Sequence, residues 1–246
     1  MILFENVQYV ENRLENEGWA VAREAVSAEG VASMHDWINE RRAQAAGKPE
    51  LEAQFEKDAA PGSGAMAVRK MRRLFWDDPE FWRPLLEREG IFDWARRLVG
   101  PKPALVFHAA FLKPAEIGGP VVYHQDQALW NRDYPGAMNM WLALAPSDEE
   151  NGCLRFCSGS HLRGHVEHRM LDSDDFHVGI EPGELGYQPD PAVMAPGDLA
   201  IWGRYMIHGS LANKSPRGRD SIVMVFVDST TPDFGSIDQF LVPEAA

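Results

Sequence analysis

The second half of the chain alternates short β-prone segments with turn residues. Each segment is rich in apolar, β-branched or aromatic residues and is bounded by turn-forming residues, a pattern typical of strands. Several short strands in succession favour a sandwich or barrel, and a double-sheet jelly roll of the cupin kind suits their number and holds a site between its sheets. The segments expected to form strands are 104–112, 121–123, 138–145, 152–156, 198–202 and 221–227.

The N-terminal part of the chain predicts helices instead. After a short strand at 18–22, Ser27 is a good N-cap for a helix that reaches about Arg42. The spacing of apolar residues over 79–98 fits one or two further helices. Between these helices, the glycine, proline and charged residues of 47–65 indicate a mobile loop or lid.

The length of 246 residues suits one elaborated domain. We therefore expect a mainly β fold with a helical N-terminal part over about 1–100. A cupin-like jelly-roll core flanked by α-helices should follow over about 101–230, and both parts should belong to a single domain spanning 1–246.

The charge and hydropathy of the chain limit its partners. With 24 basic and 37 acidic residues the net charge is −13, so a surface that binds nucleic acid is not expected. The short basic cluster over 69–73 is interpreted as a solvated face. No apolar run approaches the length that spans a bilayer, and the N-terminus lacks the basic flank and apolar stretch of a secretory signal. We expect a cytoplasmic protein without membrane partners, in which Cys153 and Cys157 stay reduced.

Three residues form a candidate metal site. In an extended strand residues i and i+2 point to the same side, so His124 and Asp126 can offer an imidazole nitrogen and a carboxylate oxygen to one ion. A second strand could supply His208 as the third ligand. Two histidines and one carboxylate on one face of an octahedral ion leave its other positions open, as in non-haem Fe(II) oxygenases. A lone His-x-Asp triplet is a weak signal, so its interpretation as a metal site depends on the motifs that surround it in the sequence.

Those surroundings form an ordered set of motifs: Lys113-Pro114, His124-Gln125-Asp126, Glu150-Asn151-Gly152-Cys153-Leu154-Arg155-Phe156, Ser158-Gly159-Ser160-His161, Pro196-Gly197-Asp198 and His208-Gly209-Ser210. The set resembles the phytanoyl-CoA dioxygenase family of Fe(II)- and 2-oxoglutarate-dependent oxygenases, from about Gly18 to Val227. This resemblance implies a double-stranded β-helix core. It also implies that His124, Asp126 and His208 bind iron, with 2-oxoglutarate and O2 as cosubstrates.

The distal carboxylate of 2-oxoglutarate requires a fixed cation, and a guanidinium can meet it with two parallel hydrogen bonds. Arg219 aligns with the family arginine without a gap. Arg217 is the competitor, and both are expected on the same side of a strand, so register alone does not separate them. By the same resemblance, Ser210 would hydrogen-bond this carboxylate, Trp141 would line the pocket and Lys70 would be a further cosubstrate lysine. Ser210 could equally be a turn serine, and Trp141 a core aromatic.

The resemblance implies a dioxygenase that oxidises a small organic molecule, most simply by hydroxylation, and releases succinate and CO2. Epimerisation, cyclisation and desaturation would use the same cofactor chemistry. Asp126 argues against halogenation, because relatives that halogenate carry a small residue there. A non-catalytic protein, or a metal-binding cupin-like protein without 2-oxoglutarate, remains the competing hypothesis. The absence of an obvious basic cluster for coenzyme A phosphates favours a natural product or small polar substrate.

The region above the barrel is expected to shape the substrate pocket. Residues 162–190 have few regular signals and many charges, which is typical of a long insertion over the barrel mouth. His161 is expected to make a structural hydrogen bond, and His165, His168 and His177 are expected at the surface or in a lid. The residues expected beside the pocket are Gln127, Trp130, Asn131 and Tyr134, although Trp130 and Tyr134 could also pack in the outer wall.

Overall fold

The computed structural model describes residues 4–48, 51–57, 59, 63–130, 133–170, 178–230 and 239–244. Within these ranges the helices are α1 (Phe4–Asn16), α2 (Ala28–Gln44), α3 (Leu74–Asp77), α4 (Pro79–Arg88) and α5 (Ile91–Leu98). The first strands are β1 (Trp19–Ala22), β2 (Ala53–Phe55), β3 (Val68–Met71), β4 (Pro103–Lys113), β5 (Val121–His124), β6 (Met138–Ala143) and β7 (Leu154–Phe156). The remaining strands are β8 (Arg169–Met170), β9 (Val178–Gly179), β10 (Asp190–Pro191), β11 (Leu199–Gly203), β12 (His208–Ser210), β13 (Arg219–Asp228) and β14 (Phe240–Leu241).

Two antiparallel sheets form the centre of the fold. The main sheet has the order β1-β11-β6-β13-β4-β3-β2, with β14 added beside β4, and the small sheet has the order β10-β7-β12-β5. Strands that are neighbours in a sheet are mostly distant in the sequence, as in a jelly roll. The predicted mainly β fold with a jelly-roll core is therefore confirmed.

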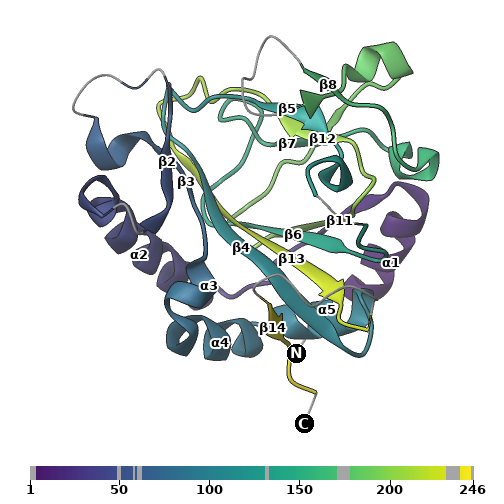
Figure 1. The fold of residues 1–246 in the computed structure, drawn as a ribbon, viewed down its shortest axis with the longest axis horizontal. Coiled ribbons are helices and arrows are strands. Elements are labelled where there is room, and N and C mark those ends of the chain that lie inside the picture. The colour runs from purple at the N-terminus through teal and green to yellow at the C-terminus, as the bar shows by residue number, and fades with distance from the viewer. Residues whose placement is uncertain are drawn as a thin grey trace.

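The two faces of the main sheet have different partners. Along β6, Met140 and Leu142 join the cluster that includes the helix residues Trp82 and Phe92, whereas Trp141 and its neighbour Ala143 join the cluster with Phe156 of the small sheet. This alternation follows from the two-residue period of a strand. Figure 1 shows α2, α3, α4 and α5 to the left of and below the main sheet, with β5, β7 and β12 above it. Side chains on the upper face of the sheet therefore point into the space between the sheets.

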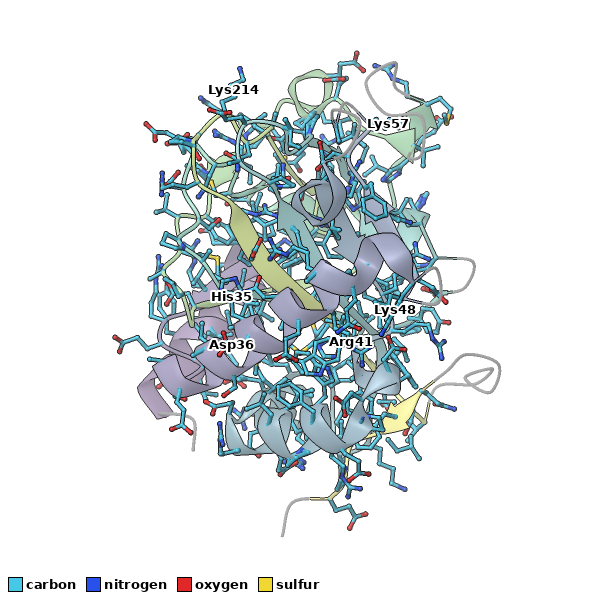
Figure 2. The ribbon with its side chains drawn as sticks, turned by 90° about the vertical axis from the view of Figure 1, so that its left-hand side faces the viewer. His35, Asp36, Arg41, Lys48, Lys57 and Lys214 are labelled. Carbon is cyan, nitrogen blue, oxygen red and sulfur yellow. The ribbon has the colours of Figure 1, made fainter. Side chains whose placement is uncertain are left out.

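Helix α2 is fixed to the main sheet by a partly buried cluster of polar side chains around Asp220. Ser27 caps the helix by accepting a hydrogen bond from the Gly30 amide at 3.0 Å, as expected for this N-cap. Further along α2, His35 Nε2 lies 3.0 Å from Asp220 Oδ2, and Arg42 donates to the same oxygen. Burial opposes the charge of Asp220, but the bonds from His35 and Arg42 outweigh it and lower the pKa of this carboxyl. Figure 2 shows His35 and Arg41 along α2.

The N-terminal part differs from the sequence prediction in two places, helix α1 and strand β2, whereas the one or two helices predicted over 79–98 are present. Helix α1 was not predicted, although Val7, Val10 and Leu14 have helical spacing and pack against the core. The segment predicted as a loop contains β2, which pairs with β3 and extends the main sheet. The region 79–98 forms two helices, α4 and α5, separated at Gly90, whose φ of 76° suits glycine.

Both cysteines are free and buried, as predicted for reduced thiols. Among the helices that the structure describes, none is long and apolar enough to cross a membrane.

Candidate active site

The three predicted ligand residues meet at one end of the small sheet. Strands β5 and β12 pair with His124 opposite His208, and the centroids of the two imidazole rings lie 4.5 Å apart. The strand does not continue to Asp126 as predicted, because Asp126 begins a short 3-10 helix after β5. Its carboxylate still reaches both imidazole rings. Its oxygens lie 3.8 Å from His124 Nε2 and 3.8 Å from His208 Nε2. One ligand atom from each residue falls within 4.8 Å of the others, so the three could hold one metal ion.

Hydrogen bonds to the backbone orient both imidazoles. His124 Nδ1 lies 2.8 Å from the carbonyl oxygen of Val122, and His208 Nδ1 lies 3.0 Å from that of Met206. A carbonyl oxygen only accepts, so each Nδ1 carries the proton and donates. Each Nε2 then faces Asp126 and is the nitrogen that a metal ion would take, because metal-ligating histidines commonly donate their other ring N–H to a carbonyl.

Trp202 links the carboxylate of the cluster to the main sheet. Its indole Nε1 donates to Asp126 Oδ2 at 2.8 Å, from β11 on the opposite side of the barrel interior. The Trp202 ring also packs against His208, with centroids 4.7 Å apart. Trp202 therefore holds Asp126 in place, a contact that the sequence analysis missed because the two residues lie far apart in the chain.

Gln125, between His124 at the end of β5 and Asp126, connects the loop above the barrel to the candidate metal site. Its side-chain nitrogen donates to the carbonyl oxygens of Gly164 at 2.8 Å and Tyr205 at 2.7 Å, and its side-chain oxygen accepts from the Val166 amide. Its backbone amide donates to His168 Nε2 at 2.9 Å. Burial lowers the pKa of His168, which favours the neutral ring that can accept this bond.

The histidines and the pocket residues predicted for the loops around the barrel mouth have different environments. His161 Nε2 lies 3.2 Å from the carbonyl oxygen of Glu15, consistent with the expected structural bond, and His165 is exposed. Trp130 packs edge-on against Tyr134, in a cluster that includes Phe107 and Val225. Gln127 Oε1 accepts from the Tyr134 amide at 3.4 Å. Asn131 and His177 lie outside the described residues.

A buried arginine lies inside the barrel on the main sheet. Arg219 begins β13 opposite Lys113 of β4, and its guanidinium carbon lies 5.1 Å from the centroid of the Trp141 ring. Its Nη1 donates to the carbonyl oxygen of Gly152 at 2.8 Å, while its Nε is buried and has no hydrogen-bond partner in the described chain. Burial lowers the pKa of Arg219 to about 10.

Lys113 brings a second buried cation to this end of the barrel. Its Nζ donates to the carbonyl oxygen of Leu211, and burial together with the charge of Arg219 holds the pKa of Lys113 well below its usual value. None of the described acidic side chains lies within ion-pair distance of Arg219 or Lys113. Because buried charges are normally paired, this end of the barrel is suited to an anionic ligand.

Arg217 lies outside the barrel. It is exposed, and its Nη2 lies 2.9 Å from Asp148 Oδ2 and 3.5 Å from Glu150 Oε2. The prediction that Arg217 and Arg219 share one side of a strand is wrong, because β13 begins only at Arg219 and Arg217 belongs to the preceding turn. An already paired surface guanidinium cannot face a ligand inside the barrel.

The remaining predicted residues point into the space between the sheets. Ser210 is buried on β12, two residues after His208 and on the same side of the strand. Trp141 is buried beneath the guanidinium of Arg219. Lys70 lies on β3 with its Nζ 4.4 Å from the ring centroid of Phe111. Burial, with the charges of nearby arginines, lowers the pKa of Lys70 to about 8, so its interpretation as part of a solvated face is wrong.

Comparisons with known proteins agree with this arrangement. A model of the family described as phytanoyl-CoA dioxygenase (PhyH) matches residues 14–221. Phytanoyl-CoA dioxygenase 1 of Oryza sativa subsp. japonica is 31% identical over 129 residues, which are 52% of this chain and 46% of that protein. The chain spans about half the length of the curated relatives it matches.

Two solved structures share the fold. The non-haem α-ketoglutarate-dependent epimerase SnoN from nogalamycin biosynthesis superimposes with a TM-score of 0.66 at 22% identity, over 92% of this chain and 82% of that chain. The carbocyclase SnoK, from the same biosynthesis, gives a TM-score of 0.69 at 20% identity, over 99% of this chain and 87% of that chain. With the family model matching most of its length, the chain belongs to the phytanoyl-CoA dioxygenase family.

Proposed function

We propose that this protein is an Fe(II)- and 2-oxoglutarate-dependent dioxygenase that oxidises a small organic molecule and releases succinate and CO2. The observation that carries the proposal is the pairing of two features in one barrel: a cluster of two histidines and one carboxylate, and a buried arginine without an acidic partner in the described chain. The first suits Fe(II) with open coordination positions, and the second suits the distal carboxylate of a keto acid.

The donor set fits this metal and cosubstrate. Hydrogen bonds from Nδ1 to backbone carbonyl oxygens orient His124 and His208 with Nε2 towards Asp126, and Trp202 fixes the carboxylate. Arg219 would meet the distal carboxylate, with Trp141 beneath its guanidinium and Ser210 on the facing sheet. When bound, iron and 2-oxoglutarate would supply the activation of O2, and the chain would orient the reactants and exclude water. Lys70 adds a further cation to the interior wall.

The substrate is proposed to be a natural product or a small polar molecule, bound over the metal beside Trp130 and Tyr134. Hydroxylation is the simplest outcome. Two proteins of the same fold are named as an epimerase and a carbocyclase, which keeps epimerisation and cyclisation as alternatives for this chain. A protein that binds metal without using 2-oxoglutarate is the competing function, and it would leave the buried charge of Arg219 without a role.

The proposal is tested by anaerobic titration of the apoprotein with Fe(II), with and without 2-oxoglutarate. We expect a visible charge-transfer band that requires both components and is lost in His208→Ala. His165→Ala, which removes an exposed histidine, is the matched control and should retain the band. A well-folded wild-type protein without any band would contradict the proposal and favour the metal-only function.

Replacing Trp202 with phenylalanine should weaken iron binding while leaving 2-oxoglutarate affinity at saturating iron nearly unchanged. Phenylalanine retains the packing against His208 but removes the donor to Asp126 Oδ2. Loss of such an outer hydrogen bond lowers metal affinity about 10–100-fold. Competition with a chelator of known affinity measures the change, and an unaltered iron affinity would show that Trp202 does not hold the carboxylate.

A further inference from the structure

Asn139 is a polar residue inside the barrel for which the proposed function has not yet given a role. It lies on β6, where its register neighbours are Trp202 of β11 and Val225 of β13. Because Met140 and Leu142 face the helices and Trp141 faces the small sheet, Asn139 shares the inward face with Trp141. Its side chain is only 1% exposed.

The side-chain nitrogen of Asn139, Nδ2, is buried and has no hydrogen-bond partner in the described part of the chain. A buried donor without a partner is destabilising, so native proteins rarely retain one unless a water or ligand satisfies it. Arg219 Nε is another such atom on the inward face of the same sheet. Both therefore point to a ligand that is bound between the sheets.

The order of side chains along the sheet indicates which end of the ligand Asn139 meets. Arg219 leans over Trp141, and Asn139 lies two residues further along β6, a rise of about 7 Å. Its neighbour Trp202 bonds directly to Asp126. A dicarboxylate held by Arg219 at one end, and directed at the metal ligands at the other, would pass Trp141 and finish at the level of Asn139.

We propose that Asn139 Nδ2 donates a hydrogen bond to the keto acid end of bound 2-oxoglutarate. This inference rests on the proposed function and extends it, because it assigns a positioning residue for the reacting end of the cosubstrate. A carboxylate or keto oxygen is an acceptor that the neutral amide can meet without adding charge beside Asp126. The bond satisfies a donor that is otherwise buried without a partner. The unpaired donor therefore destabilises the ligand-free fold, and binding of 2-oxoglutarate removes this destabilisation.

The test compares three variants by two measurements: the Kd of 2-oxoglutarate from the anaerobic charge-transfer band, and the midpoint of thermal unfolding without ligands. Asn139→Leu keeps the branching of the side chain and removes the donor. Asn139→Asp replaces the donor with a negative charge. Met140→Leu, at the adjacent position that faces the helices, is the matched control with a volume-conserving change.

We expect the Kd of 2-oxoglutarate to rise about tenfold or more in Asn139→Leu, because a hydrogen bond to a charged acceptor is lost. Asn139→Asp should raise it further by repulsion. The unfolding midpoint of Asn139→Leu should be equal to or above that of the wild type, because leucine removes the unsatisfied amide. Met140→Leu should leave the Kd unchanged.

The outcomes separate this inference from the function on which it rests. A wild-type protein without a charge-transfer band would overturn both. A normal band with an unchanged Kd in Asn139→Leu would overturn only the role of Asn139, and would assign the amide to the substrate or to a buried water. A weaker Kd accompanied by a clearly lower unfolding midpoint would show a structural role for Asn139 and would also overturn the inference.

Discussion

Replacing Asp126 with alanine is expected to abolish iron-dependent succinate formation and the charge-transfer band while leaving the fold intact. Asp126 contributes the negative charge of the proposed metal site, and each of its oxygens faces one histidine at 3.8 Å. Two neutral imidazoles alone bind Fe(II) weakly and provide no third point to fix its orientation. Iron affinity should therefore fall by at least a hundredfold, as measured by competition with a chelator.

The same substitution also has a stability component, which a second variant separates. Alanine leaves Trp202 Nε1 without its acceptor, at a cost of about 1–3 kcal/mol, or several degrees in the unfolding midpoint of a chain of this size. Asp126→Asn keeps an acceptor oxygen while removing the charge, so it should lose the band with a smaller loss of stability. Asp133→Ala removes an exposed acidic residue and is the control. Full activity in Asp126→Ala would remove this carboxylate from the metal site.

Replacing Arg219 with alanine should raise the Kd of 2-oxoglutarate at least a hundredfold without weakening Fe(II) binding. The guanidinium is buried, has one hydrogen bond to Gly152 and forms no ion pair with a described acidic group, so a bound carboxylate would be its charge partner. A bidentate pair in such a site is worth several kcal/mol, which corresponds to a change of this size. Titration of the charge-transfer band at saturating iron measures it.

Two further arginine variants make this prediction specific. Arg219→Lys keeps the charge but loses the planar fork, so we expect an intermediate affinity. Arg217→Ala should leave the affinity unchanged, because Arg217 is exposed and paired with Asp148. If neither Arg219→Ala nor Arg217→Ala changed the Kd, the carboxylate would have to bind elsewhere, and the metal-only function would gain support.

The parts of the fold that could be predicted depend on short-range patterns. Strands β4, β6, β11 and β13 were expected to within a few residues, because apolar and turn residues alternate locally along them. The spacing of His124 and Asp126 indicated a shared ligand position even though Asp126 begins a 3-10 helix. Helix α1 was missed because its apolar residues are diluted by glutamates and asparagines, and its packing against β1 and the core stabilises it.

Contacts between distant segments could not be predicted. The bond from Trp202 to Asp126 joins two sheets, and the bonds of Gln125 reach a loop some forty residues later. No local pattern encodes either contact. The position of Arg217 could not be predicted, because residues i and i+2 face the same side of a strand. Arg217 and Arg219 can be told apart only when the first residue of β13 is known. Lys70 was misjudged because its ammonium group lies over the rings of Phe107 and Phe111, which come from a strand later in the chain.

Adjacent residues of opposite charge begin the last long strand, and together they determine its register. Arg219 faces the barrel, while Asp220 faces the other way and binds His35 and Arg42 of α2. A slip of one position would exchange these faces. An aspartate would then enter the compartment suited to an anion, and an arginine would be pressed against Arg42. Pairing of β13 that is misaligned by one position is thus opposed by charge on both faces of the main sheet at once.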